Sequence, residues 1–218
     1  MSLEDKVNQD FFSEINIETS YVLGILFNSC LPRGFLGIVI RSRQRDLIEL
    51  VNKKLGITYK IFTPRNKNSF TIQMDNVPNL RRKLNYFSLD YDKGERAFPL
   101  HIIKAENMSH FIRGFFDSNA RISLKDRKIE EIIFTYNPDF LKFLSVEIQK
   151  LTGIVSEYRK GNVLVYGSND IDYKTKQLIS KREVFEKLYD MLYNKDRELI
   201  ISREIYLPSK KARFINYS

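Results

Sequence analysis

Residues 110–119 read HFIRGFFDSN, and residues 21–29 read YVLGILFNS. Each stretch is an apolar segment with one glycine near its centre, Gly114 in the first and Gly24 in the second. A glycine inside a helix costs about 1 kcal/mol relative to alanine. That cost is offset where two helix backbones approach closely, because only glycine leaves room for the contact. We therefore expect two helices that pack against each other at Gly24 and Gly114.

The same order of elements follows each of these stretches. In the first half, the patterns predict strands over 35–40, 57–63 and 69–74 and helices over 46–56 and 77–86. In the second half, they predict strands over 122–124, 132–136, 155–158 and 162–166 and helices over 138–151 and 180–193. Each half is thus expected to run helix, two strands, helix, two strands, helix. We place the halves at 1–90 and 107–218, with a connector at 91–106.

The composition is that of a globular protein with a core to bury. The 218 residues are 43% hydrophobic and 29% charged, which excludes a disordered chain, a collagen-like fibre and a coiled coil. The longest apolar runs, 21–27 and 35–40, are too short to span a bilayer. The first residues are too polar for a secretory signal, and the single cysteine cannot form an internal disulfide. We expect a cytoplasmic protein, with an organelle matrix as the alternative.

The charge balance indicates a polyanionic partner. Lys and Arg number 36 against 27 Asp and Glu, so the net charge is +9 and the isoelectric point is near 9.5. A basic protein of this size attracts nucleic acid by sequence-independent electrostatics. A membrane surface is disfavoured, because no long basic amphipathic helix is present in the sequence.

The strands alternate between apolar and polar residues. Ile72 lies between Thr71 and Gln73, and Ile122 lies between Arg121 and Ser123. One face of each sheet is therefore expected to pack on helices, while the other is polar and partly basic. Such a face can enter the major groove of DNA and reach phosphates and base edges. The alternative is a solvated sheet face without a partner.

Basic and polar residues occupy corresponding strands and hairpins in both halves. The candidate DNA contacts are Arg41, Arg43, Arg45, Lys60, Arg65, Lys67, Thr71 and Gln73 in the first half, and Arg121, Ser123, Lys125, Arg127, Arg159 and Lys160 in the second. This symmetry of placement favours contact with DNA over basic hairpins that arise by chance.

Residues 23–30 (LGILFNSC) and 111–120 (FIRGFFDSNA) resemble the two signature helices of the LAGLIDADG homing endonuclease family, in its single-chain form. Residues 203–207 (REIYL) are similar to the family's closing segment, so the resemblance covers about 17–207. It implies an α+β fold of two pseudo-symmetric αββαββα units, with saddle-shaped antiparallel sheets over duplex DNA. Because both units lie in one chain, it also implies a monomer.

The sequence departs from the family at its catalytic positions. In the family, an acidic residue five positions after each glycine helps to hold divalent ions at the scissile phosphates. The corresponding residues here are Ser29 and Asn119, whose oxygens are neutral, whereas Mg²⁺ prefers anionic oxygen ligands. Asp117, three residues after Gly114, is a candidate substitute ligand. The first stretch has Phe27 at the equivalent position.

The leading hypothesis is a duplex-DNA-binding protein of this family without nuclease activity and without a cofactor. One alternative is an active homing endonuclease with an unusual Mg²⁺ site. A second is a splicing maturase that binds intron RNA, and a third is a mobile-element remnant that binds DNA weakly. His101 and His110 have no cysteine pair near them, so a zinc site is not expected.

Overall fold

The structure is a computed structural model. It describes Asn8, residues 10–56, 59–65 and 68–87, Leu89, Arg96, and residues 101–125, 128–159 and 161–194. The chain divides into two compact units, Met1–Ser118 and Asn119–Ser218. Each unit combines helices with antiparallel strands, which confirms the expected α+β class. The helix before the boundary belongs to the first unit up to Ser118, whereas the sequence pattern groups it with the second half.

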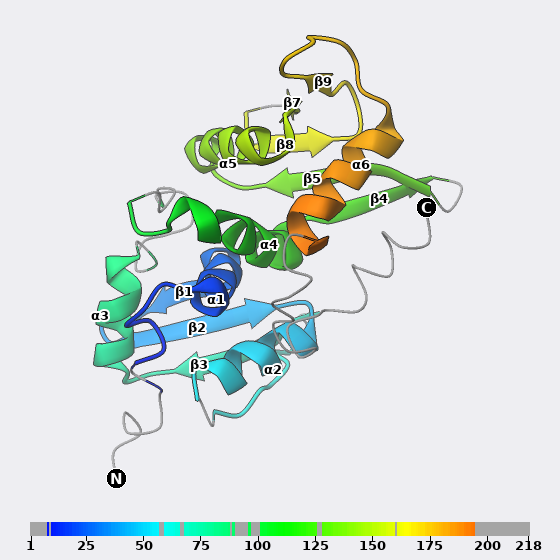
Figure 1. The fold of residues 1–218 in the computed structure, drawn as a ribbon. Coiled ribbons are helices and arrows are strands. Elements are labelled where there is room, and N and C mark those ends of the chain that lie inside the picture. The colour runs from blue at the N-terminus through cyan, green and yellow to red at the C-terminus, as the bar shows by residue number, and fades with distance from the viewer. Residues whose placement is uncertain are drawn as a thin grey trace. The chain divides into compact units, whose positions relative to one another are not determined.

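The first unit consists of a central helix, a sheet and flanking helices. Its elements are α1 (Ile17–Ser29), β1 (Cys30–Arg33), β2 (Gly37–Ser42), α2 (Arg45–Lys54), β3 (Phe70–Met74), α3 (Pro78–Tyr86), the 3-10 turn η2 (Ala105–Asn107) and α4 (Met108–Asn119) (Figure 1). The antiparallel sheet has the order β1-β2-β3. In place of the strand expected over 57–63, an isolated bridge joins Phe62 to Thr71. Residues 57 and 58 lie outside the described residues.

The core of the first unit lies between the sheet and α1. Cys30, Ile40 and Ile72 lie side by side on the inner face of the three strands and are fully buried. Helix α1 begins at Asn16, whose side chain accepts from the backbone N–H groups of Glu18 and Thr19. Its residues are buried almost all round, which explains why its sequence is apolar rather than amphipathic.

The second unit is built on a four-stranded sheet. Its elements are β4 (Arg121–Lys125), β5 (Lys128–Thr135), α5 (Pro138–Thr152), β6 (Ile154–Val155), β7 (Glu157–Arg159), β8 (Val163–Tyr166), β9 (Ile171–Asp172), α6 (Lys181–Tyr189) and the π-helical turn η3 (Asp190–Asn194). The sheet has the order β4-β5-β8-β7, and β6 pairs separately with β9. Helix α5 packs against β8 (Figure 1).

Capping residues set the helix ends of the second unit. Asn137 accepts from the N–H of Phe140 at the start of α5, and Gly153 ends that helix with φ 76°. Ser180 caps α6 through the N–H of Glu183. The expected strand over 155–158 is instead divided, because Val155 pairs with Ile171 while β7 pairs with β8. The family-like segment at 203–207 lies outside the described residues. Among the helices described, none is long and apolar enough to cross a membrane.

Candidate nucleic-acid interface

The two glycine-containing helices, α1 and α4, cross with their backbones in contact. A methyl group on Gly24 would lie 2.1 Å from the carbonyl oxygen of Phe111. A methyl group on Gly114 would lie 2.0 Å from the carbonyl oxygen of Tyr21. Both distances are far below van der Waals contact, so the crossing requires glycine on both helices. Figure 1 shows α1 and α4 side by side in the first unit.

Asp117 is part of this helix crossing. Its side chain is 1% exposed, and its Oδ2 accepts a hydrogen bond of 2.8 Å from the hydroxyl of Tyr21 on α1. In the last turn of α4, the carbonyl oxygen of Ser118 accepts from Asn28 Nδ2 at 2.7 Å. This second contact satisfies a carbonyl that lacks a partner within the helix. Asp117 therefore holds the helices together and does not present its carboxylate to solvent.

Ser29, at the first of the family's catalytic positions, is also buried. It is 1% exposed, and its hydroxyl donates a 2.8 Å hydrogen bond to the carbonyl oxygen of Ile25. This hydrogen bond turns the hydroxyl back onto its own helix. Ser29 thus offers a neutral hydroxyl oxygen whose hydrogen is already donated to the backbone.

A buried arginine that sequence reasoning did not identify binds the end of α1. Arg96 is 1% exposed and donates to the carbonyl oxygens of Phe27 at 2.6 Å and Cys30 at 2.7 Å. A guanidinium is favourable here because the C-terminal carbonyls of a helix carry partial negative charge. Arg96 lies in the stretch that the sequence pattern assigns to a connector, and nothing in the local pattern distinguishes it from a surface arginine.

Asn119, at the second catalytic position, pairs with the backbone of β5 in the second unit. Its Nδ2 donates to the carbonyl oxygen of Thr135 at 3.0 Å, and its Oδ1 accepts from the N–H of the same residue at 3.2 Å. The amide thereby mimics a backbone partner beside the strand. A carboxylate could accept from the N–H but could not donate to the carbonyl.

The residues at these positions do not fit a divalent ion. Ser29 and Asn119 are neutral, and the side chains of both are bonded to backbone groups. In the part of the chain that the structure describes, no group of three His, Cys, Asp or Glu side chains could hold a metal ion. His101 is exposed and His110 is buried in α4.

The sheet of the first unit carries a polar outer face opposite its core. Cross-strand register and alternation place Leu31, Arg33, Val39, Arg41, Thr71 and Gln73 on this face. Arg41 is half-buried and lies directly across from Thr71. Thr71 is 2% exposed, although the alternation predicted a side chain open to solvent. The chain at Phe62 continues the sheet beside Thr71 and accounts for part of that burial.

Three buried polar atoms gather on this outer face. They are Arg41 Nε, Thr71 Oγ1 and Ser69 Oγ, and none has a hydrogen-bond partner among the described residues. Ser69 precedes Thr71 by two positions along an extended segment, so both hydroxyls lie on one side. Buried polar groups are nearly always satisfied, and unsatisfied ones need an explanation. One guanidinium and two hydroxyls suit an anionic oxygen. We call Arg41, Ser69 and Thr71 the Arg41 cluster.

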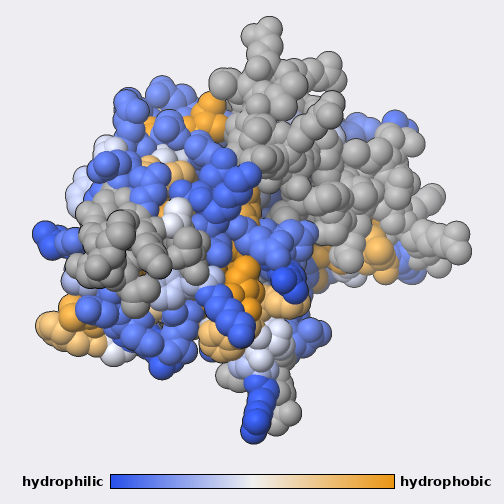
Figure 2. Space-filling view, turned by 90° about the horizontal axis from the view of Figure 1, so that it is seen from below, coloured by the Kyte–Doolittle hydropathy of each residue, from blue (hydrophilic) through white to orange (hydrophobic). Residues whose placement is uncertain are grey.

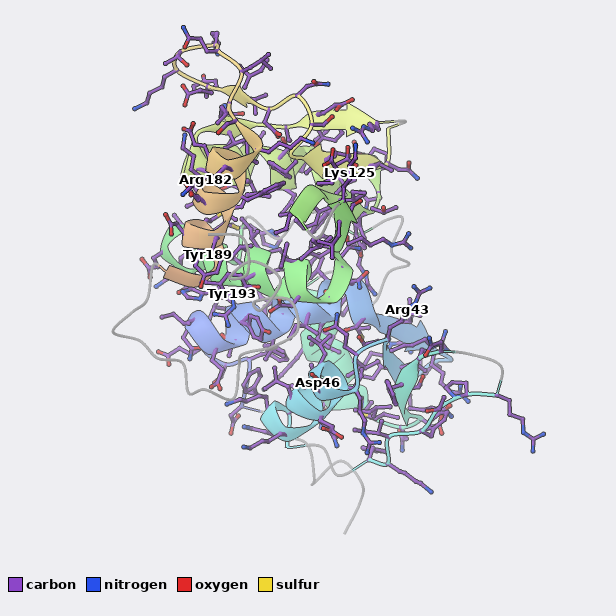
Figure 3. The ribbon with its side chains drawn as sticks, turned by 90° about the vertical axis from the view of Figure 1, so that its right-hand side faces the viewer. Arg43, Asp46, Lys125, Arg182, Tyr189 and Tyr193 are labelled. Carbon is purple, nitrogen blue, oxygen red and sulfur yellow. The ribbon has the colours of Figure 1, made fainter. Side chains whose placement is uncertain are left out.

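Exposed cations lie on the chain segments next to the Arg41 cluster in sequence. Arg43, Lys60 and Arg65 are exposed, and Figure 3 shows Arg43 beyond the end of β2 and Asp46 in the first turn of α2. Arg45 is exposed but pairs with Glu49 at 2.7 Å. Two further DNA-contact candidates of this unit, Gln73 and Lys67, are not exposed cations in the described part of the chain. Gln73 is half-buried and donates to Asp75 at 3.1 Å, and Lys67 lies outside the described residues.

The sheet of the second unit has a more balanced charge. Arg159 pairs with Glu131 at 2.8 Å and with Glu157 at 3.3 Å, and it donates to Ser168 Oγ at 2.8 Å. Hydrogen bonding to Arg159 holds the pKa of Glu157 below its usual range. Glu131 faces Arg159 only once the strands are paired, whereas Glu157 lies two positions away on the same strand, where alternation places both side chains on one face. Of the other candidates, Arg121 and Lys125 are exposed and Ser123 is half-buried, while Arg127 and Lys160 lie outside the described residues.

A protein of known structure is similar in architecture to this chain. No protein-family model matches the chain. The homing endonuclease I-WcaI, solved bound to its DNA recognition sequence, is similar with a TM-score of 0.56 and 8% identity, over 98% of this chain and 97% of that one. The N-terminal LAGLIDADG domain of WhiA gives a TM-score of 0.49 and 10% identity, over 94% and 96% of the two chains.

One curated protein is similar in sequence. A probable translation initiation factor IF-2 of Thermococcus kodakarensis is 27% identical over 132 residues, which is 55% of this chain and 11% of that protein. The chain therefore matches only about a tenth of that relative's length. At the level of the fold, the resemblance drawn from the two glycine-containing stretches is confirmed. The chain has the fold of the LAGLIDADG homing endonucleases.

Proposed function

We propose that this protein binds duplex DNA as a monomer, through the outer sheet face of the first unit, and does not cleave it. The observation that carries the proposal is the Arg41 cluster, where the Nε of Arg41 and the hydroxyls of Ser69 and Thr71 are buried without partners among the described residues. These three atoms are closed to solvent, so a phosphate oxygen would reach them once neighbouring side chains move aside, and it would then accept from Arg41 Nε and from the hydroxyls of Ser69 and Thr71. This single anchor would satisfy three groups that otherwise remain unpaired.

The charge and the fold support the same partner. The net charge of +9 favours polyanions in general. The structurally similar I-WcaI was solved as a complex with its DNA recognition sequence. This similarity is a reason to test duplex DNA as the partner of the present chain. Because the second unit's Arg159 is paired with two glutamates, we assign the main phosphate contacts to the first unit.

The absence of cleavage follows from the residues at the two catalytic positions. Ser29 is buried and bonded to Ile25, and Asn119 is bonded to Thr135. Neither can supply the negative charge that offsets a divalent ion between phosphates. Asp117, the candidate substitute, is occupied by the hydroxyl of Tyr21 at the helix crossing. Because none of these three side chains would hold a divalent ion, DNA binding would not lead to phosphodiester hydrolysis.

The test is a selection from a randomised duplex-DNA library in the presence of Mg²⁺, with bound and cut fractions sequenced separately. The proposal expects an enriched site that is recovered intact. An enriched site recovered as cut ends would contradict the absence of cleavage. Stronger binding to structured RNA would favour the maturase alternative. Weak, sequence-blind and strongly salt-dependent binding would favour a mobile-element remnant.

A further inference from the structure

The most exposed large hydrophobic side chain among the described residues lies at the tip of the hairpin between β1 and β2. Phe35 is 90% exposed, and its neighbour Leu36 is also exposed. Scattered single hydrophobic residues on a surface are ordinary. An almost fully exposed phenylalanine needs an explanation, because burying its ring against a partner would be favourable by roughly 1.5–3 kcal/mol.

The hairpin tip is held in place by the start of α3. Arg81 Nη1 donates to the carbonyl oxygens of Gly34 and Gly37. The N–H of Val77 donates to the carbonyl oxygen of Leu36 at 3.1 Å. Gly34 adopts φ 53°, which allows the chain to turn at this point. The ring of Phe35 is therefore presented from a fixed turn.

The surroundings of the tip are cationic. Helix α3 contains the run Arg81-Arg82-Lys83 and no acidic residue. Arg82 is exposed, and Arg33 at the base of the hairpin pairs with Asp75 at 2.8 Å. A protruding aromatic ring beside several cations matches nucleic acid, which offers flat apolar bases between phosphates. An apolar protein surface would not complement the charges on α3. Figure 2 shows hydrophobic residues as small patches among hydrophilic ones on the face viewed there.

We propose that Phe35 is an apolar wedge that inserts between two bases of the bound DNA, beyond the phosphate anchored by the Arg41 cluster. This inference rests on the proposed function, because it needs duplex DNA as the partner. Insertion would unstack one base step, and contacts from the α3 cations to the flanking phosphates would offset that cost. No bond is made or broken.

The test uses the duplex obtained by the selection described above, with 2-aminopurine placed at successive positions. The fluorescence of 2-aminopurine rises when the base loses its stacking partner. With the unmodified protein, we expect a rise at one step near one end of the site. With Phe35→Ala, we expect that rise to vanish and the affinity to fall about tenfold. The dependence of affinity on salt should not change, because no phosphate contact is lost.

Two controls separate the possible outcomes. Phe143→Ala removes another exposed ring, on α5, and should change neither the fluorescence nor the affinity. Phe35→Tyr keeps a flat ring and should retain the signal. If Phe35→Ala binds the duplex with unchanged affinity and fluorescence, Phe35 does not insert between bases, whereas the proposed DNA binding is unaffected. Failure of the unmodified protein to bind duplex DNA would overturn both. A change in sedimentation on Phe35→Ala would show that a second copy covers the ring, which also contradicts the wedge.

Discussion

The hydroxyl of Ser29 donates to the carbonyl oxygen of Ile25 at 2.8 Å, within the helix that carries the first glycine-containing stretch. Ser29 is 1% exposed, so its side chain packs inside the first unit. The sequence resemblance expects a catalytic acid at this position.

Replacing Ser29 with Asp should destabilise the protein. A carboxylate at a site that is 1% exposed loses its hydration, and the guanidinium of Arg96 is already engaged with the carbonyl oxygens of Phe27 and Cys30. We therefore expect a loss of about 2–4 kcal/mol in unfolding free energy. Ser29→Ala removes one hydrogen bond and should cost about 1 kcal/mol or less. Urea denaturation measures both. An aspartate variant as stable as the unmodified protein would mean that the position is open to solvent.

Replacing Gly24 or Gly114 with Ala should separate α1 from α4. In an ordinary helix this substitution stabilises by about 1 kcal/mol. Here the new methyl group meets a carbonyl oxygen at 2.1 Å or 2.0 Å, so we expect a loss of about 3 kcal/mol or more. Thermal unfolding measures the change. Gly161→Ala is the matched control, because a methyl group there meets nothing within 4 Å and only the positive φ of 69° opposes it. Equal effects at all three positions would contradict the close crossing.

Removing the cation of the Arg41 cluster should weaken DNA binding uniformly across sequences. With Arg41→Gln, one phosphate contact is lost, so the slope of log affinity against log salt should fall by about one. Arg182→Gln is the control, since Arg182 is exposed on α6 (Figure 3) and pairs with Glu186 at 2.7 Å. Fluorescence anisotropy at several salt concentrations measures both variants. An unchanged slope for Arg41→Gln would show that this cluster does not hold a phosphate.

Asp170 should make the stability depend on pH. Burial raises the pKa of its carboxyl to about 6 and outweighs the opposite effect of the hydrogen bond that its Oδ2 accepts from the N–H of Gly167 at 2.5 Å. The protonated form is thus more favoured in the folded protein than in the unfolded chain. Its contribution is present below the ordinary pKa of about 4 and is lost as the pH rises through about 6.

The matched variant for this dependence is Asp170→Asn, which does not titrate. Relative to that variant, the unmodified protein should lose roughly 2–3 kcal/mol of unfolding free energy between about pH 4 and pH 7. Urea midpoints across this range measure the difference. Parallel pH profiles for the two proteins would contradict a raised pKa at Asp170.

Much of the fold could be predicted because its signals are local. Asn137 and Gly153 bound α5 as the capping rules require, and Ser180 caps α6. The division of the expected strand over 155–158 could not be predicted, because the partners of β6 and β7 are distant in sequence. The shared order of elements in the two halves remains a sequence observation.

The candidate site was less predictable than the fold. Alternation placed Thr71 and Gln73 on the polar face, and the register agrees. It could not predict that Thr71 is buried, since this depends on the chain at Phe62. Arg96 and Glu131 were missed for the same reason, because each acts through a tertiary contact. Lys67, Arg127 and Lys160 lie outside the described residues and stay predictions.

The central claim is that the protein binds a DNA site and leaves it intact. The most direct measurement incubates the selected duplex, labelled at both ends, with saturating protein and Mg²⁺ or Mn²⁺, and separates the strands on a denaturing gel. The account predicts a fully bound duplex in which both strands keep their full length. Cleavage at a defined position in both strands would contradict it, and a loss of that cleavage in Asp117→Asn would identify the ligand that replaces Ser29 and Asn119.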